Sequence, residues 1–178
     1  LEDGSFARAV RFVRAYRFPN PRRVRGVFDP DSDMNGRTML LDARFAGFRF
    51  PFGVRISRTL DETRATPEGT EHVWGYSYRT LEGHFERGEI TFEIVKREWS
   101  GRVYFRVHSF SKRARIPNLV YRVGFGLLGR TLQRRFALHA LERTRAYVRQ
   151  SLVRDACLRD DATATALLLD DRTEEEPA

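Results

Sequence analysis

The sequence predicts an α+β fold, in which an antiparallel sheet of about six strands is covered by a long C-terminal helix. Two observations support this prediction. Apolar residues alternate with polar or small ones in successive short segments, which is the pattern of strands that face a core on one side. After Pro117, apolar residues recur every three or four positions, which is typical of one helix face. Only this last segment is long enough, so we expect it to cover the sheet.

The individual strands follow from the alternation and from the turn residues between segments. Thr66-Pro67-Glu68-Gly69 has the composition of a turn, and Pro51, which lacks an amide donor, indicates a sheet edge or a bulge. The expected strands cover residues 24–28, 39–45, 48–56, 73–78, 90–95 and 103–107. The expected helix face includes Leu128, Leu132, Phe136 and Ala140. Short turns between consecutive strands favour an antiparallel order.

The chain divides into three segments by its composition. Residues 1–21 contain a short amphipathic helix and a linker, and the helix ends near Phe18 because the following proline disfavours helical geometry there. Residues 22–150 contain the expected sheet and its covering helix. Residues 151–178 are rich in Asp and Glu, and we expect them to form a disordered acidic tail.

Composition restricts the class of protein. The net charge of +8 is carried mostly by arginines spread along the chain, which favours a solvated basic surface over a nucleic-acid patch. Cys157 is the only cysteine, so this chain has no internal disulfide or cysteine-rich zinc cluster, and a reducing cytoplasm is the expected location. No apolar run approaches the roughly 18 residues that span a bilayer, so we expect no membrane span.

Polar residues gather in the turn between Gly83 and Gly88. His84 and Glu86 have the H-x-E spacing of zinc deaminases, but the P-C-x-x-C half of that motif is absent. His84, Glu86 and Glu89 remain candidates for metal binding or acid–base catalysis, and the plainer interpretation is that the carboxylates pair with nearby arginines. We predict no metal and no cofactor.

A G-x-G-x-x-G spacing occurs at residues 124–129. A dinucleotide-binding fold needs a buried strand before this motif and further strand–helix units after it. Here one helix and a tail complete the chain, so we interpret the glycines as sites of close packing on the sheet.

An aromatic stripe formed by Trp74, Tyr76 and Tyr78 falls on one face of an expected strand. Such residues belong to a core or line a pocket. The two tyrosines favour the pocket, because a buried phenol needs a hydrogen-bond partner that a ligand or a water molecule provides.

The sequence around the polar turn also resembles a known family. The matching residues are Tyr78-x-Thr80-Leu81-x-Gly83-His84-x-Glu86-x-Gly88-Glu89 and Phe105-Arg106-Val107-x-Ser109-Phe110-Ser111. They resemble the bacterial and plant family called domain of unknown function nineteen-ninety, which is placed in the START-like, or SRPBCC, superfamily of helix-grip proteins. The resemblance runs from about Val24 to about Val148. It implies a curved sheet that grips the C-terminal helix around a cavity, which relatives use for lipids, polyketides or other apolar molecules.

These observations lead to three hypotheses about function. The first is the binding of a small apolar or lipid-like molecule between sheet and helix. Its expected contacts are Trp74, Tyr76, Tyr78, His84, Glu86, Glu89, Arg106 and Phe136. The second is an enzyme that uses His84 with Glu86 or Glu89 on such a molecule, with its catalytic residues otherwise unknown. The third is a basic module that binds nucleic acid or protein. The sequence gives no oligomeric state.

Overall fold

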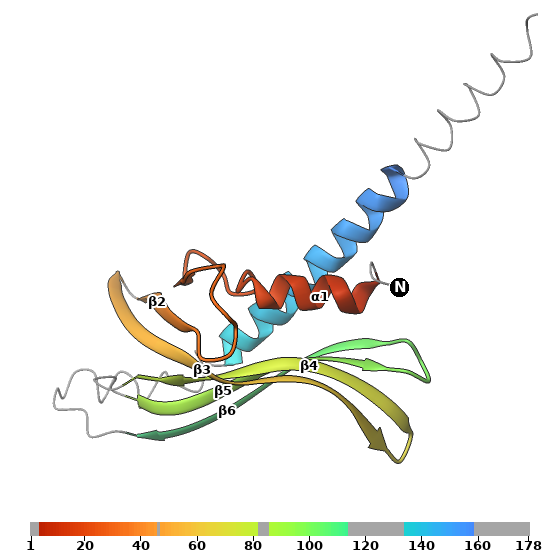
Figure 1. Ribbon diagram of the computed structural model, residues 1–178. Coiled ribbons are helices and arrows are strands. Elements are labelled where there is room, and N and C mark those ends of the chain that lie inside the picture. Colours follow the sequence, from red (N-terminus) through yellow and green to blue (C-terminus); the bar gives the residue numbers. More distant parts are fainter. Residues whose placement is uncertain (1–3, 46, 82–85, 114–133, 159–178) are drawn as a thin grey trace, which may run out of the picture.

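The computed structural model describes residues 4–45, 47–81, 86–113 and 134–158. Six strands form one antiparallel sheet in which each strand pairs with the one before it in the sequence. They are β1 (Val24–Val27), β2 (Thr38–Phe45), β3 (Phe48–Thr66), β4 (Gly69–Thr80), β5 (Glu86–Arg97) and β6 (Val103–Arg113). The sheet is bent, and β2 and the start of β3 rise toward the helices (Figure 1). The predicted antiparallel sheet is confirmed.

The long strand β3 shows how the turn residues set the register. Thr66 pairs with Gly69, so only Pro67 and Glu68 connect β3 to β4, as the turn composition predicts. Pro51 pairs with β2, whereas the pairing of β3 with β4 begins at Val54. On its β4 side, Pro51 pairs with none of the described residues, so its missing amide donor breaks no hydrogen bond to them. β3 continues to residue 66, ten residues beyond the predicted end at residue 56.

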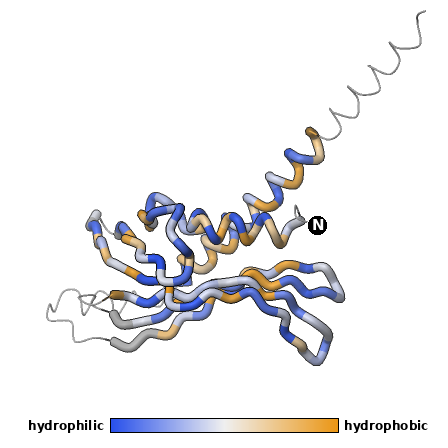
Figure 2. Tube along the Cα trace, in the orientation of Figure 1, coloured by the Kyte–Doolittle hydropathy of each residue, from blue (hydrophilic) through white to orange (hydrophobic). Residues whose placement is uncertain are grey.

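The two faces of the sheet differ in what they carry. The inner face, which we define by Tyr76 and Phe92, packs against the helices, and both side chains are at most 1% exposed. The outer face, defined by Glu71 and Arg106, lies on the opposite side of β4 and β6, because successive residues of a strand alternate between faces. Figure 2 shows apolar residues gathered where the sheet lies beneath the helices, while the hairpin ends are mostly hydrophilic.

The N-terminal helix α1 (Ser5–Arg14) lies on the inner face. Ala9, Phe12 and Val13 from this helix are buried, and Tyr16 and Phe18 continue the buried set just after it. The expectation that the C-terminal segment alone covers the sheet was therefore wrong. The spacing of three and four residues that predicted α1 also gives it a face to bury, and the sheet is the surface against which that face is buried.

The C-terminal helix spans residues 134–158 among the described residues and lies on the same side of the sheet as α1 (Figure 1). Ala140, Thr144 and Ser151 are buried on one side of it. The rings of Phe12 and Tyr147 stack with centroids 4.3 Å apart, so the two helices contact each other as well as the sheet. The helix continues eight residues past the predicted boundary at residue 150.

Two further expectations concern this part of the chain. Leu128 and Leu132, the first residues of the expected helix face, lie outside the described residues. The predicted acidic tail does so from residue 159 onward. Neither helix in the described ranges is long and apolar enough to cross a membrane.

Candidate ligand-binding site

Three tyrosines lie together between the sheet and α1. Tyr76 and Tyr78 come from the inner face of β4, and Tyr16 follows α1; they are 1%, 5% and 7% exposed. The ring centroids of Tyr16 and Tyr78 are 6.4 Å apart. The hydroxyl of Tyr76 donates a long hydrogen bond of 3.4 Å to the backbone carbonyl of Val13, which ties β4 to α1.

Backbone geometry at the end of α1 places the Tyr16 ring in the core. Tyr16 has a φ angle of 52°, in the left-handed region that ends many helices, and its amide donates to the carbonyl of Val13 at 3.0 Å. The ring then lies directly against the backbone of Gly26 in β1. It also contacts Phe18 edge-on, with centroids 5.0 Å apart. Tyr16 is therefore held by both the helix and the sheet.

The hydroxyl of Tyr16 has no hydrogen-bond partner among the described residues, although it is buried. The hydroxyls of Tyr16 and Tyr78 interact: a hydrogen-bonding contact between them raises the pKa of Tyr16 and lowers that of Tyr78, although this contact does not meet the distance and angles of a full hydrogen bond. A buried phenol without a partner is uncommon, because the lost interaction with water is not replaced. This atom is the main polar feature of the inner face.

Burial keeps all three phenols neutral. It raises the pKa of Tyr16 and of Tyr76 well above the ordinary value, and it raises the pKa of Tyr78 to about 12. The neighbouring phenols raise the pKa of Tyr16 further, whereas the positive charge of Arg37 lowers that of Tyr76. Each hydroxyl can thus donate a hydrogen bond at neutral pH.

Arg37 is a second unusual polar group near this cluster. It is 8% exposed and directly precedes β2. Its Nη2 atom donates to the carbonyls of Ser32 and of Pro30, the latter at 3.4 Å, and its guanidinium carbon lies 5.0 Å from the ring centroid of Phe28. Its Nε atom has no partner among the described residues.

The structure brings four of the eight predicted contact residues to the inner face. Trp74, Tyr76 and Tyr78 share it, and the rings of Trp74 and Tyr76 meet edge-on with centroids 6.1 Å apart. Phe136 reaches the same core from the C-terminal helix, with its ring centroid 6.5 Å from that of Phe92. The aromatic part of the predicted site is thus assembled as one surface, from β4, β5 and the C-terminal helix.

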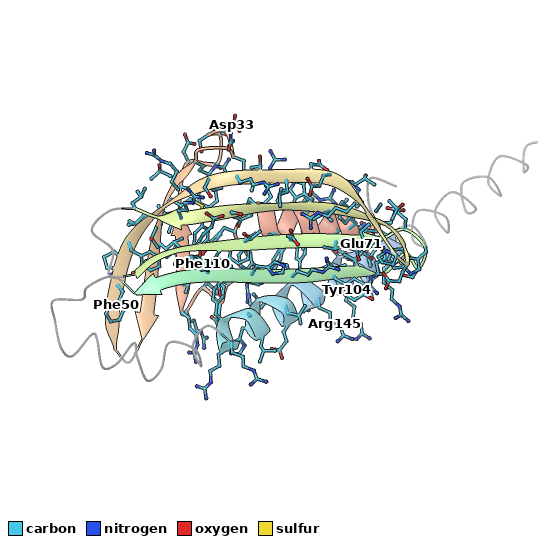
Figure 3. All side chains as sticks on the ribbon, turned by 90° about the horizontal axis from the view of Figure 1, so that it is seen from below. Asp33, Phe50, Glu71, Tyr104, Phe110 and Arg145 are labelled. Carbon is cyan, nitrogen blue, oxygen red and sulfur yellow. The ribbon has the colours of Figure 1, made fainter. Side chains whose placement is uncertain are left out.

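Two other predicted contacts lie on the outer face, so their grouping with the aromatic stripe is corrected. Arg106 binds Glu71 through two hydrogen bonds of 3.0 and 3.2 Å. Glu89 accepts a hydrogen bond from Arg79, its partner across β4 and β5. Figure 3 shows the sheet from this side, with Glu71, Tyr104 and Phe110 on it. Successive side chains of a strand point to opposite faces of the sheet. Arg106 and Glu89 are each an odd number of residues from the inner-face residues of their own strands, so they point to the outer face.

The remaining two predicted contacts cannot be placed in the site. His84 lies outside the described residues, and Glu86 pairs with Arg113 in the β5–β6 ladder through its backbone. Within the described ranges, no three His, Cys, Asp or Glu side chains are grouped as metal ligands would be. His108 of β6 lies 3.6 Å from Glu93.

The outer face holds an ion-pair network built on two buried carboxylates. Glu71 accepts hydrogen bonds from Arg97 and Arg106, and its side chain is 5% exposed. Glu93, 7% exposed, pairs with Arg64 at 3.1 Å. Burial alone raises the pKa of Glu71, but the hydrogen bonds from Arg106 and Arg97 outweigh burial and hold this pKa below its ordinary value. These carboxylates are already paired, so their role here is structural.

Sequence reasoning missed the two residues with unpaired atoms. Helical spacing places Tyr16 on the apolar face of the N-terminal segment but says nothing of its hydroxyl, and nothing in the local sequence distinguishes Arg37 from the many other arginines. Their lack of partners depends on contacts between segments far apart in the chain. No periodic pattern reports such contacts.

The family model described as Domain of unknown function (DUF1990) matches residues 2–143, which include α1, all six strands and the first part of the C-terminal helix. No curated protein and no solved structure matches the chain significantly.

Proposed function

Since the chain belongs to the DUF1990 family, whose description states no activity, we propose from its structure that it binds a small, mostly apolar molecule. The ligand lies between the inner face of the sheet and the two helices. Its apolar part contacts the aromatic side chains there, and one polar atom accepts a hydrogen bond from Tyr16. Sites for small molecules commonly combine apolar walls with a few polar groups in this way.

The unpaired hydroxyl of Tyr16 is the observation that carries this proposal. Leaving a buried hydroxyl without a partner costs about 1–3 kcal/mol. A ligand that offers an acceptor to Tyr16 removes this cost when it binds. Pairing this hydroxyl therefore contributes to the free energy of binding. Tyr78 is beside it, and a second acceptor or the same one can reach both phenols.

The arrangement of the elements supports the same proposal. A bent antiparallel sheet holds α1 and the C-terminal helix on one face, which is compatible with the helix-grip fold implied by the family resemblance. Placement in the START-like superfamily is part of this proposal. So is a cytoplasmic location, for which the support is the single cysteine, Cys157, an exposed free thiol.

The two alternative functions receive less support from the described residues. An enzyme that uses Glu89 would need this carboxylate beside the ligand, whereas it pairs with Arg79 on the outer face. A basic interaction module would need unpaired cations, but several of the arginines on the outer face are paired with carboxylates. Binding at the inner face is therefore the better hypothesis.

The test is a search for bound molecules followed by a blocking substitution. Native mass spectrometry and solvent extraction of purified protein should reveal a co-purified apolar compound, and the neutral dye Nile red should bind saturably. Ala140, fully buried on the C-terminal helix, is changed to methionine so that its side chain enters the ligand space. Ala146→Met, at an exposed position of the same helix, is the matched control.

We expect Ala140→Met to reduce dye binding and the amount of co-purified compound, and Ala146→Met to leave both unchanged. Overpacking also destabilises a core, typically by about 1–3 kcal/mol, so both variants are compared below their unfolding temperatures. Absence of any co-purified compound together with absence of Nile red binding would overturn the proposal.

A further inference from the structure

Arg37 is a buried cation without a carboxylate partner among the described residues. In the outer-face network, by contrast, Arg64, Arg97 and Arg106 each pair with a carboxylate. The guanidinium of Arg37 instead contacts two backbone carbonyls and the ring of Phe28. Neutral contacts compensate only part of the cost of removing a positive charge from water.

The unpaired atom of Arg37 belongs to the same part of the core as the tyrosine cluster. Arg37 directly precedes the first residue of β2, and its carbonyl accepts a hydrogen bond of 2.8 Å from the amide of Ile56. Ile56 pairs with Tyr78 across β3 and β4. The positive charge of Arg37 also lowers the pKa of the Tyr76 phenol. Arg37 therefore lies at the border of the proposed ligand space.

The two unpaired atoms are both hydrogen-bond donors and can be satisfied by the same kind of partner. Among the described residues, Tyr16 Oη and Arg37 Nε are the buried side-chain nitrogen and oxygen atoms without a hydrogen bond. Both atoms can donate a hydrogen bond, and the guanidinium has no atom that can accept one. A group that satisfies both must be an acceptor, and next to a guanidinium a negatively charged acceptor gains most.

We propose that the ligand of the inner-face site carries a carboxylate, which binds the guanidinium of Arg37 and accepts a hydrogen bond from the hydroxyl of Tyr16. This inference rests on the proposed function and adds the chemical class of the ligand: an apolar body that ends in an acid, such as a fatty acid. The contacts of Arg37 Nη2 with Ser32 and Pro30 are structural and hold the loop before β2, but they leave Nε free for the ligand.

The experiment compares acids with alcohols of equal length. Saturated fatty acids of several chain lengths, and the primary alcohol matching each, compete with Nile red for the wild-type protein at neutral pH. A hydrogen bond to a charged group contributes about 1.5–3 kcal/mol, so we expect the best acid to bind about ten- to a hundredfold more tightly than its alcohol. Equal affinities for acid and alcohol would overturn the carboxylate assignment while leaving the proposed function intact.

Three variants identify the residues involved. Arg37→Gln should abolish the preference for the acid, because the neutral side chain offers no positive charge to a carboxylate, whereas Arg58→Gln, at an exposed position on β3, should keep the preference. Tyr16→Phe should weaken acid binding by about tenfold. Thermal unfolding without ligand shows whether each variant is folded. A folded Arg37→Gln protein that still prefers the acid would contradict the assignment.

The comparison in the wild-type protein and the Tyr16→Phe variant decide the question if Arg37→Gln does not fold. Unchanged acid affinity in Tyr16→Phe would remove Tyr16 from the site. Failure of Nile red, acids and alcohols alike to bind the wild-type protein is a different result, because it overturns the proposed function together with this inference.

Discussion

Tyr16 occupies the space that a side chain at Gly26 would need: a Cβ atom at position 26 would lie 2.6 Å from Cδ1 of the Tyr16 ring. Such a distance is shorter than carbon atoms tolerate, so one of the two groups would have to move. Gly26 thereby links the edge strand β1 to the end of α1. The close approach also fixes where the Tyr16 hydroxyl enters the core.

The first prediction concerns this contact. Gly26→Ala should lower the free energy of unfolding by about 1–3 kcal/mol, the usual cost of overpacking a core, because the buried ring has little room to shift. Chemical denaturation measures the change. Arg25→Ala, at the exposed neighbouring position of β1, should change stability by no more than about 0.5 kcal/mol. Equal stability of the Gly26→Ala and wild-type proteins would show that the ring relocates easily.

The second prediction concerns the unpaired phenol. Tyr16→Phe removes a buried hydroxyl without breaking a hydrogen bond to any described residue. We therefore expect the free energy of unfolding of the ligand-free protein to rise by about 1–3 kcal/mol. Tyr76→Phe is the matched control. The hydroxyl of Tyr76 donates a hydrogen bond to the carbonyl of Val13, so the free energy of unfolding of this variant should fall by about 0.5–1.5 kcal/mol.

Thermal unfolding of protein freed of bound molecules by solvent extraction and refolding measures both changes. The opposite signs are the informative result, because the two substitutions remove the same atom from similarly buried rings. A loss of stability in Tyr16→Phe equal to that in Tyr76→Phe would mean that the Tyr16 hydroxyl has a partner in the ligand-free protein.

Much of the fold could be predicted from the sequence, because strands with one apolar face leave a period of two in it. Trp74, Tyr76 and Tyr78 were assigned correctly to one face in this way. The second half of β3 was missed because, there, charged residues such as Asp61 and Arg64 stand among few apolar ones. The register with β4, rather than burial of one apolar face, keeps this part extended.

The site was predicted less well, for a different physical reason. Arg106 was grouped with the aromatic stripe because it is part of a sequence motif, but its position in β6 directs it to Glu71 on the outer face. The role of Arg37 depends on the carbonyls of the loop before it and on the strands beside it. A single sequence contains the residues but not their partners, so unpaired atoms become visible only in the folded chain.

The third prediction concerns the outer face and pH. The folded-state pKa of Glu71 lies below its ordinary value of 4.5, so the ionised carboxylate stabilises the fold. This contribution is fully present above about pH 4.5 and is lost as the pH falls through the lower folded-state pKa. The free energy of unfolding of the wild-type protein should therefore fall on acidification by more than that of Glu71→Gln, which has no carboxylate to protonate at this position.

At neutral pH we expect Glu71→Gln to lower the free energy of unfolding by about 1–2 kcal/mol. This is less than the loss on breaking a fully buried ion pair, because Arg97 and Arg106 are each about one third exposed. Denaturation with urea at several pH values between neutral and acidic measures the difference. Glu68→Gln, in the exposed β3–β4 turn, is the control and should follow the wild-type curve. Parallel pH dependences of Glu71→Gln and the wild type would contradict the assigned role.

The fourth prediction concerns where the folded unit ends. Arg8 of α1, with a side chain only 5% exposed, pairs with Asp155 at 2.5 Å, and Ser151 is buried, so the helix continues to stabilise the fold beyond residue 150. A chain ending at residue 150 should therefore be about 1–3 kcal/mol less stable than one ending at residue 158, because Arg8 loses this buried contact. Asp155→Asn in the chain ending at 158 should reproduce part of that loss. Urea denaturation measures all three, and equal stability of the two truncated chains would place the end of the folded unit at residue 150 after all.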